Sequence, residues 1–221
     1  MKEFDLITFD CYGTLIDWET GIYEAFSSEA AKDGILIERE EVIAAYLAAE
    51  KEVEAGPYVP YRDVLTRSAH LAASTLGWKI DTERAAFLVA SLPDWAPFAD
   101  TNPALDRLAS RYHLGILSNV DDALLAETMR HLTVPFEVIV TAEQVHSYKP
   151  RRSHFEEAMR RKGSARWLHA GQSYFHDIGP TLEMGIRAAW INRKGEEISH
   201  GGRQPLYVVR DLMELAQLLP V

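Results

Sequence analysis

The most informative segment of the chain is Phe4-Asp5-Leu6-Ile7-Thr8-Phe9-Asp10-Cys11-Tyr12-Gly13-Thr14-Leu15-Ile16-Asp17. Its short apolar run, which predicts a buried strand, ends at Asp10, and a turn with Gly13 and Thr14 follows at once. Open α/β sheets bind their ligands at the carboxyl ends of their strands, so we expect Asp10 and Thr14 to lie in a ligand site. The alternative is that Asp10 only caps the turn, because Asp is favoured there.

The rest of the sequence predicts an α/β fold. Residues 18–32 and 38–90 have helical periodicity without a strand signal, and from residue 103 onward helices alternate with short apolar strands. This alternation is typical of βαβ units and a parallel sheet. We therefore predict a Rossmann-like, doubly wound parallel sheet with an inserted all-helical cap domain over its carboxyl edge. The expected core domain comprises residues 1–16 and 93–221, and the expected cap domain comprises residues 17–92.

The helical and strand patterns also give approximate bounds for each element. The expected helices are 18–32, 38–55, 61–76, 82–91, 103–112, 124–132, 153–162, 180–185 and 212–219. After the first strand, the expected strands are 113–117, 136–140, 167–170, 188–191 and 206–209.

The composition is that of an ordinary globular protein. The 221 residues are 47% apolar and 25% charged, and the formal net charge of −10 argues against a broad nucleic-acid surface. No run reaches the roughly 18 to 20 apolar residues of a membrane span. The first residues do not have the pattern of a signal peptide. We therefore expect a cytoplasmic protein that binds neither nucleic acid nor a membrane.

The single cysteine, Cys11, could be mistaken for a nucleophile. One cysteine cannot form an intramolecular disulfide. A strand residue next to Asp10 points to the opposite side, and nearby carboxylates disfavour a thiolate. We interpret Cys11 as a small side chain packed against the end of the strand.

A second apolar strand ends in polar residues, in the sequence Leu114-Gly115-Ile116-Leu117-Ser118-Asn119. A helix is expected to begin shortly after this segment, and the free N–H groups at a helix start attract anions. Ser118 and Asn119 are therefore candidates for binding an anionic group. Alternatively, Ser118 only caps the helix.

A third segment, Ser147-Tyr148-Lys149-Pro150, holds a lysine shortly before the helix expected from Ser153. Pro150 restricts Lys149 to an extended backbone, which makes the local chain rigid. A rigid lysine before a helix is a candidate for a fixed positive charge in the site. The alternative is a solvated surface lysine.

A fourth segment leads from an apolar strand into the polar loop Gly171-Gln172-Ser173-Tyr174-Phe175-His176-Asp177. A helix is expected directly after it, so Asp177 is either an acid of the site or only the helix cap. His176 is interpreted as structural, because a lone histidine beside a cap seldom acts as a base. The sequence contains no Cys/His cluster with the spacing of a zinc site.

Together these four segments resemble the four motifs of the haloacid dehalogenase superfamily, in the superfamily's order and across nearly the whole chain. The leading Asp of that superfamily is a covalent nucleophile, and the helical insertion falls where its cap domain usually lies. Its phosphatases usually carry a second acid two positions after the nucleophile, as general acid. This chain has Tyr12 there, as the 2-haloacid dehalogenases do, so the resemblance favours the dehalogenase branch.

The resemblance implies a mechanism with three catalytic residues. Ionised Asp10 would attack C2 of a short (S)-2-haloacid, the halide would leave, and an aspartyl ester would form. Water positioned by Asp177 and Lys149 would then hydrolyse the ester to the 2-hydroxy acid. Lys149 would pair with Asp10, and an ammonium within about 4 to 6 Å lowers the pKa of a carboxylate by about 1 to 3 units. This chemistry needs no metal or other cofactor.

The resemblance also implies a small anionic substrate and a set of residues that bind it. Hydroxyl groups and a backbone amide would bind its carboxylate oxygens, and an aromatic ring would shape the halide side of the pocket. The resemblance allows a homodimer. The implied substrate-binding residues are Tyr12, Thr14, Arg62, Ser118, Asn119, Gln172 and Tyr174.

The chain departs from the dehalogenase pattern in the arginine that receives the halide. Dehalogenases typically supply this arginine from the start of the cap, but residues 42–55 contain none. Arg39 precedes that helix, and Arg62 lies in the next one. Either arginine could reach the pocket; we take Arg62 as the candidate, with a surface charge as its alternative.

Two other functions remain open. In a magnesium-dependent phosphatase of the same superfamily, Asp10, the backbone carbonyl of Tyr12 and Asp177 would hold Mg²⁺. The missing acid at position 12 argues against efficient phosphoester cleavage, because general acid catalysis contributes about 10² to 10⁴ in rate. A non-catalytic binding protein would tolerate the loss of Asp10 or Lys149, yet both are present. A dehydrogenase is disfavoured, since the first strand does not lead into a Gly-rich dinucleotide fingerprint.

Overall fold

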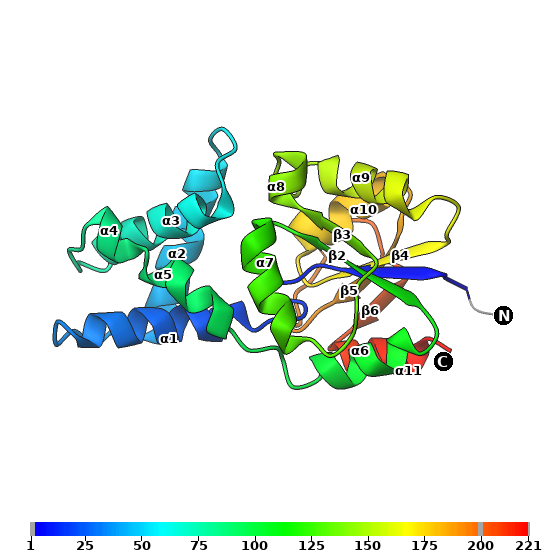
Figure 1. Ribbon diagram of the computed structural model, residues 1–221, viewed down its shortest axis with the longest axis horizontal. Helices are drawn as coiled ribbons and strands as arrows, with labels where there is room; N and C mark the ends of the chain where they lie inside the picture. Colours follow the sequence, from blue (N-terminus) through cyan, green and yellow to red (C-terminus); the bar gives the residue numbers. More distant parts are fainter. Residues whose placement is uncertain (1–2, 199–200, 221) are drawn as a thin grey trace. The chain divides into compact units, whose positions relative to one another are not determined.

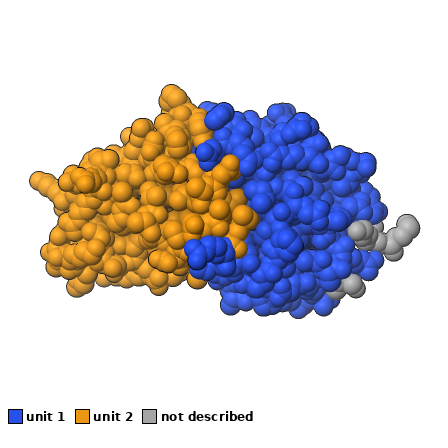
Figure 2. Space-filling view, in the orientation of Figure 1, with its two compact units in different colours: residues 1–16, 97–119, 130–221 blue, residues 17–96, 120–129 orange. Residues whose placement is uncertain are grey.

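The computed structural model describes residues 3–198 and 201–220, which form two compact units. Figure 2 shows them in different colours. The α/β unit contains the described residues within 1–16, 97–119 and 130–221, and the helical unit contains residues 17–96 and 120–129. The helical unit thus includes residues 93–96 and 120–129, beyond the insertion of residues 17–92 expected from the sequence.

A six-stranded sheet forms the centre of the α/β unit. All its strands are parallel, in the order β3-β2-β1-β4-β5-β6. This is the strand order of a doubly wound sheet whose direction of winding reverses beside the first strand. The predicted fold class is confirmed. The strands are β1 (Leu6–Phe9), β2 (His113–Ser118), β3 (Val138–Thr141), β4 (Trp167–Gly171), β5 (Arg187–Ile191) and β6 (Tyr207–Val209).

Helices cover both faces of this sheet (Figure 1). On one face, α9 packs on β2 and β3, and α10 packs on β5; on the other, α6 packs on β2, and α11 packs on β5 and β6. The four central strands, β2, β1, β4 and β5, are almost wholly buried, as expected for a parallel sheet covered on both faces. The helices are α6 (Thr101–Ala109), α8 (Ala142–Val145), α9 (Ser153–Lys162), α10 (Gly179–Glu183) and α11 (Leu212–Leu218), with a π-helix, η3 (Tyr174–Ile178).

The helical unit consists of helices that pack through narrow apolar stripes. In the second helix, α2, Val42, Ala45, Tyr46 and Ala49 are buried, and this helix packs along α3. Phe26 packs edge-on against Phe87, with ring centroids 5.1 Å apart. The helices are α1 (Trp18–Ala31), α2 (Arg39–Glu54), α3 (Tyr61–Thr75), α4 (Thr82–Ala85), α5 (Phe87–Ser91) and α7 (Asp122–Thr128), with 3-10 turns η1 (Leu92–Asp94) and η2 (Met129–His131) following α5 and α7.

Several expected bounds were wrong for local reasons. The helix expected over 82–91 divides into α4 and α5 at Ala86. The helix expected to begin at Pro103 begins at Thr101, because proline is tolerated in the first turn of a helix. The short α8 was missed, since four residues are too few to show a period. The π-helix lies where a polar loop was expected. Within residues 3–198 and 201–220, no helix combines the length and the apolar character of a membrane span.

Candidate active site

The candidate site lies at the carboxyl end of β1, in the α/β unit. Asp10 follows β1 directly, while Ser118 ends β2 and Gly171 ends β4. The register places Phe9 of β1 beside Ile116 of β2 and Ala170 of β4, so the three strands end nearly level. The sheet therefore brings the first, second and fourth sequence segments to one edge, next to the reversal of winding where such sheets bind ligands.

Lys149 joins these segments through its side-chain ammonium. Its Nζ donates to Oδ1 of Asp10 at 2.8 Å, to Oδ1 of Asp177 at 2.6 Å and to the carbonyl of Leu117 at 2.8 Å. The three residues with charged side chains are buried, with exposed fractions of 8% for Asp10, 2% for Lys149 and 1% for Asp177. An ammonium has three protons, so these bonds use all of them. The alternative of a solvated surface lysine is wrong.

Thr14 holds the other oxygen of Asp10. Its hydroxyl donates to Oδ2 of Asp10 at 2.9 Å and accepts from the backbone N–H of Gln172 at 2.9 Å. A hydroxyl has a single proton, and this one is committed to the carboxylate. In this arrangement Thr14 orients Asp10, while its expected contact with a substrate carboxylate remains a prediction.

Ser118 and Asn119 have different surroundings. The side chain of Asn119 accepts from the backbone N–H of Lys149 at 2.7 Å and donates to the Lys149 carbonyl at 3.2 Å, so it fixes the lysine backbone. The hydroxyl of Ser118 is fully buried and has no hydrogen-bond partner among the described residues. An unsatisfied buried hydroxyl is costly, so Ser118 is a donor available to a ligand.

The fourth segment folds into the π-helix η3, a geometry that is frequent at functional sites. Ser173 caps this helix, because its hydroxyl accepts from the N–H of His176 at 3.1 Å. A Cβ atom at Gly171 would lie only 2.6 Å from the Cβ of Asp177, so glycine is needed for Asp177 to approach β4. The strand end, the cap and the π-helix together place Asp177 beside Lys149.

Three other residues of this segment were assigned roles from the sequence. Tyr174 donates its hydroxyl to the carbonyl of Arg203 at 2.7 Å, and its ring packs on Trp190 with centroids 5.4 Å apart. Gln172 contacts the site through its backbone N–H, and its carbonyl accepts from the indole of Trp190 at 2.8 Å. The ring of His176 lies 3.0 Å from the hydroxyl of Ser173, which fits its structural interpretation.

Tyr12 and Arg62 belong to different units. Tyr12 is half-buried in the loop after Asp10, where it forms a bridge with Ile16. Arg62 lies in the first turn of α3, and its Nε is 3.3 Å from Oδ2 of Asp121, while 55% of its side chain is exposed. Asp121 also accepts the backbone N–H groups of Arg62 and its neighbour Tyr61, and so caps α3. The roles of Tyr12 and Arg62 in substrate binding remain predictions.

Burial and the shared ammonium give the two carboxylates opposite pKa directions. Burial raises the pKa of Asp10, and the charge of Asp177 adds to this, while Lys149 and Thr14 oppose it. Burial also acts to raise the pKa of Asp177, but the charge of Lys149 and the hydrogen bond from His169 hold that pKa well below its usual range. Lys149 lowers the pKa of Asp10, as expected, but burial outweighs this effect and the net shift of that pKa is upward. One ammonium cannot compensate two buried carboxylates equally.

Cys11 has the properties of a structural residue. Burial raises the pKa of its thiol well above the ordinary value, and the charge of Asp10 raises it further. A thiol with a raised pKa is a poor nucleophile. The interpretation of Cys11 as a packed side chain is confirmed.

The sequence analysis missed two residues that hold the site together. Arg193, which follows β5, donates to the carbonyl of Thr14 at 2.9 Å and pairs with Asp100 at 3.0 Å. His169 lies within β4 and is 3.1 Å from Asp177. The sequence contained a signal for each of them. Arg193 is a charged residue shortly after a strand, and His169 is an imidazole inside an apolar strand.

The site offers few ligands for a metal ion. Within the described parts of the chain, no group of three or more His, Cys, Asp or Glu side chains is placed to hold one. Asp10 and Asp177 are the two carboxylates of the site, and both already accept from Lys149. The donor set is therefore a poor fit for Mg²⁺, which favours oxygen ligands in octahedral geometry.

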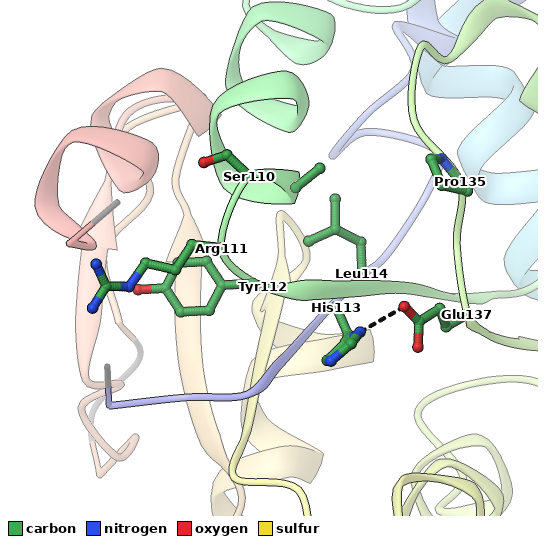
Figure 3. Close-up of a pocket in the computed structure, with 8 residues that line it drawn as sticks. Ser110, Arg111, Tyr112, His113, Leu114, Pro135 and Glu137 are labelled. Carbon is green, nitrogen blue, oxygen red and sulfur yellow. Dashed lines mark hydrogen bonds and ion pairs between the residues drawn. The ribbon is translucent and has the colours of Figure 1, made fainter. Parts of the chain in front are cut away.

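A separate cavity lies at the opposite end of the sheet (Figure 3). It has a volume of about 340 Å³ and lies at the amino end of β2, where the ring of His113 is 2.5 Å from Oε1 of Glu137. Ligand sites of open α/β sheets lie at the carboxyl ends of the strands, so this cavity is not the candidate active site.

Comparison with known proteins places these observations in context. Residues 4–169 match a family model described as haloacid dehalogenase-like hydrolase. The chain is 26% identical over 230 residues to an (S)-2-haloacid dehalogenase of Pseudomonas putida, covering 99% of this chain and 98% of that protein.

Solved structures of similar proteins share the fold. The chain superposes with a TM-score of 0.82 and 20% identity on the L-2-haloacid dehalogenase of Xanthobacter autotrophicus with chloropropionic acid covalently bound, covering 99% of this chain and 98% of that one. It superposes with a TM-score of 0.84 and 19% identity on the putative hydrolase YfnB of Bacillus subtilis bound to magnesium, covering 100% of both chains.

The charge balance of the site predicts how substitutions change stability. Lys149→Met leaves two buried carboxylates without a counter-charge, so we expect it to lower the free energy of unfolding by about 3 to 5 kcal/mol. Asp10→Asn leaves the ion pair of Lys149 and Asp177 intact, and should leave the free energy of unfolding unchanged or raise it. Urea denaturation at neutral pH measures both effects. Equal losses in the two variants would contradict this description of the charges.

Proposed function

Because the chain belongs to the haloacid dehalogenase-like hydrolase family, we propose that it hydrolyses short (S)-2-haloacids to 2-hydroxy acids. The observation that carries the proposal is the buried Asp10 at the end of the central strand β1, held by Lys149 and Thr14, with Tyr12 in place of a second acid. The similarity to an (S)-2-haloacid dehalogenase over nearly the full length of both chains supports the choice of substrate.

In the first proposed step, a carboxylate oxygen of Asp10 attacks C2 of the substrate. The bond from carbon to halogen breaks, the halide leaves with the electron pair, and an ester joins C2 to Asp10. Lys149 and Thr14 fix the two carboxylate oxygens at 2.8 and 2.9 Å, so the nucleophile is oriented before the substrate arrives. A departing halide needs no proton, which is consistent with an aromatic residue at position 12.

In the second proposed step, water hydrolyses the ester. Water adds to Cγ of Asp10 as one of its protons passes to Asp177, and the bond breaks between Cγ and the ester oxygen that is joined to C2. That oxygen leaves with the product and takes up the proton held by Asp177, and Asp10 releases the remaining water proton to solvent. The low pKa of Asp177 keeps it ionised, and Lys149 links it to the reacting carboxyl group.

The proposed substrate-binding groups differ in whether they already have a hydrogen-bond partner and in the part of the substrate that they would contact. The unpartnered hydroxyl of Ser118 is the best placed to bind the carboxylate of the substrate, because it is buried at the end of β2. The backbone N–H of Asn119, at the start of the next turn, would bind the second oxygen. Tyr12, Gln172, Tyr174 and Arg62 are retained as residues that shape the pocket or receive the halide. We propose no metal or other cofactor.

The alternative is a magnesium-dependent phosphatase, in which Asp10, the carbonyl of Tyr12 and Asp177 would be the ligands. The similarity in fold to magnesium-bound YfnB keeps this alternative open. The small set of carboxylates and the absence of an acid at position 12 count against it. A donor set of this kind would not supply the proton that a phosphoester leaving group needs.

A halide-release assay with and without EDTA distinguishes the two functions. We expect purified protein to release chloride or bromide from (S)-2-halopropionate and haloacetate at the same rate in both conditions, because the proposed chemistry uses only side chains. The control is p-nitrophenyl phosphate with added Mg²⁺. Phosphatase turnover that EDTA abolishes, together with no halide from any 2-haloacid, would replace the proposal with the alternative.

Replacement of the nucleophile tests the covalent step. Asp10→Asn should lower the rate of halide release by about 10³-fold or more, as removal of a catalytic nucleophile does in other enzymes. In wild-type protein, a single turnover in ¹⁸O-labelled water should add one heavy oxygen to Asp10, detected by peptide mass spectrometry. The hydroxyl of the product should then carry no label, because its oxygen comes from Asp10. Label in the product alone would mean that water attacks C2 directly.

The raised pKa of Asp10 predicts the acid limb of the pH profile. Asp10 must be ionised to attack, so single-turnover halide release should fall as the pH drops through a pKa above the ordinary Asp value of about 3.9. Asp177→Asn removes a nearby negative charge, which lowers the pKa of Asp10, so the acid limb should move to lower pH. Measuring halide in the first turnover separates this effect from the loss of ester hydrolysis. If the acid limb of Asp177→Asn stays in place or moves to higher pH, the proposed influence of Asp177 on the pKa of Asp10 is wrong.

A further inference from the structure

A chain of buried polar side chains runs behind the candidate site, along β1 and β4. The indole Nε1 of Trp167 lies 2.7 Å from the hydroxyl of Thr8, which lies 2.8 Å from Nδ1 of His169. Nε2 of His169 then lies 3.1 Å from Oδ1 of Asp177. Thr8 and His169 are register partners on the two neighbouring strands, so their side chains lie on the same face of the sheet.

The direction of each hydrogen bond in this series follows from its two ends. The indole N–H of Trp167 can only donate, so the hydroxyl of Thr8 accepts from it. The ionised carboxylate of Asp177 can only accept, so Nε2 of His169 carries a proton and donates to it. In the neutral imidazole Nδ1 is then the acceptor, and the hydroxyl of Thr8 directs its proton to it.

This donor comes from a different element than Lys149 does. His169 belongs to β4, and its ring packs edge-on against Phe155 of α9 with centroids 5.3 Å apart, so it cannot swing away. It is fully buried. Both Lys149 and His169 donate to Oδ1 of Asp177, which leaves Oδ2 as the oxygen with which Asp177 can meet a water molecule.

We propose that His169 is a positioning residue for ester hydrolysis: its Nε2–H holds Oδ1 of Asp177, so that the other oxygen is aimed at the attacking water. This inference rests on the proposed function, in which Asp177 takes a proton from that water. His169 does not touch the substrate, and it acts only through Asp177. Removing its hydrogen bond should therefore slow the second chemical step and spare the first.

The charged and titratable groups around Asp177 come from several elements of the α/β unit. A change at His169 leaves all the others in place, so its effect can be separated from theirs. These groups are Asp10 after β1, Lys149 before α9, His154 in α9, His169 in β4 and His176 in η3.

A matched pair of variants tests the proposal. The amide nitrogen of glutamine reaches about as far as Nε2 of histidine, so His169→Gln keeps a donor for Asp177. The shorter side chain of His169→Asn can meet Thr8 but not Asp177. We expect His169→Asn to form the 2-hydroxy acid about 10- to 100-fold more slowly in a single turnover, with first-turnover halide release within about threefold of wild type. His169→Gln should recover most of the loss.

Quenched samples give a direct readout of the step affected. Esterified Asp10 should accumulate in His169→Asn, where mass spectrometry should find its peptide heavier by the carboxyalkyl group of the substrate, and it should not accumulate in His169→Gln. Thermal melts followed by circular dichroism check that both variants are folded. If both variants are equally slow, or if halide release and hydroxy-acid formation slow together, His169 has only a packing role and the proposal is wrong.

A second measurement does not depend on the substrate. Carbon-13 labelling of Asp Cγ allows the Asp177 carboxyl to be titrated by NMR, with Asp177→Asn to assign the signal. His169→Asn should raise the pKa of Asp177 and His169→Gln should not, because only the first loses the donor. If wild type releases no halide but this shift is present, dehalogenation fails while the positioning of Asp177 by His169 stands. An unchanged titration in both variants would overturn the positioning.

Discussion

The structure of the site depends on one buried ammonium. Nζ of Lys149 bonds to Asp10, to Asp177 and to the carbonyl of Leu117, and so joins the ends of β1 and β2 to η3. These three segments are far apart in the sequence and meet only because β1 lies between β2 and β4 in a parallel sheet. Without the lysine, two carboxylates would lie buried side by side, which no arrangement of hydroxyl groups could compensate.

The surroundings of the same ammonium give the two carboxylates different pKa values. Asp177 has Lys149 at 2.6 Å and a second donor in His169, whereas Asp10 has Lys149 at 2.8 Å and the hydroxyl of Thr14. The pKa of Asp177 is therefore lowered and that of Asp10 is raised by its burial. Titratable groups whose surroundings move their pKa values apart usually have different roles. This asymmetry is the physical reason to assign one acid to attack on carbon and the other to activation of water.

The sequence predicted the fold and the position of the acids, because both follow from the pattern of strands. An apolar run that ends in a polar residue specifies a strand end, and parallel strands end at a common edge. The sequence could not predict which partner each polar atom takes. Local sequence did not show that the hydroxyl of Thr14 binds Asp10, or that the side chain of Asn119 binds the backbone of Lys149. The π-helix and the pKa direction of Asp10 also depend on distances between segments, which no local pattern encodes.

The hydrogen bonds within the site limit which of its polar groups could bind a substrate anion. The proton of Thr14, the side chain of Asn119 and the backbone N–H of Gln172 each have a protein partner in the α/β unit. Among the site hydroxyl groups of the described residues, the one at Ser118 is buried without a partner. A buried donor without a partner costs free energy that an anionic ligand can restore, which is why the proposed function puts the substrate carboxylate at the end of β2. In the proposed reaction, a carboxylate bound there would lie at the strand next to β1, where C2 has to be for Asp10 to reach it.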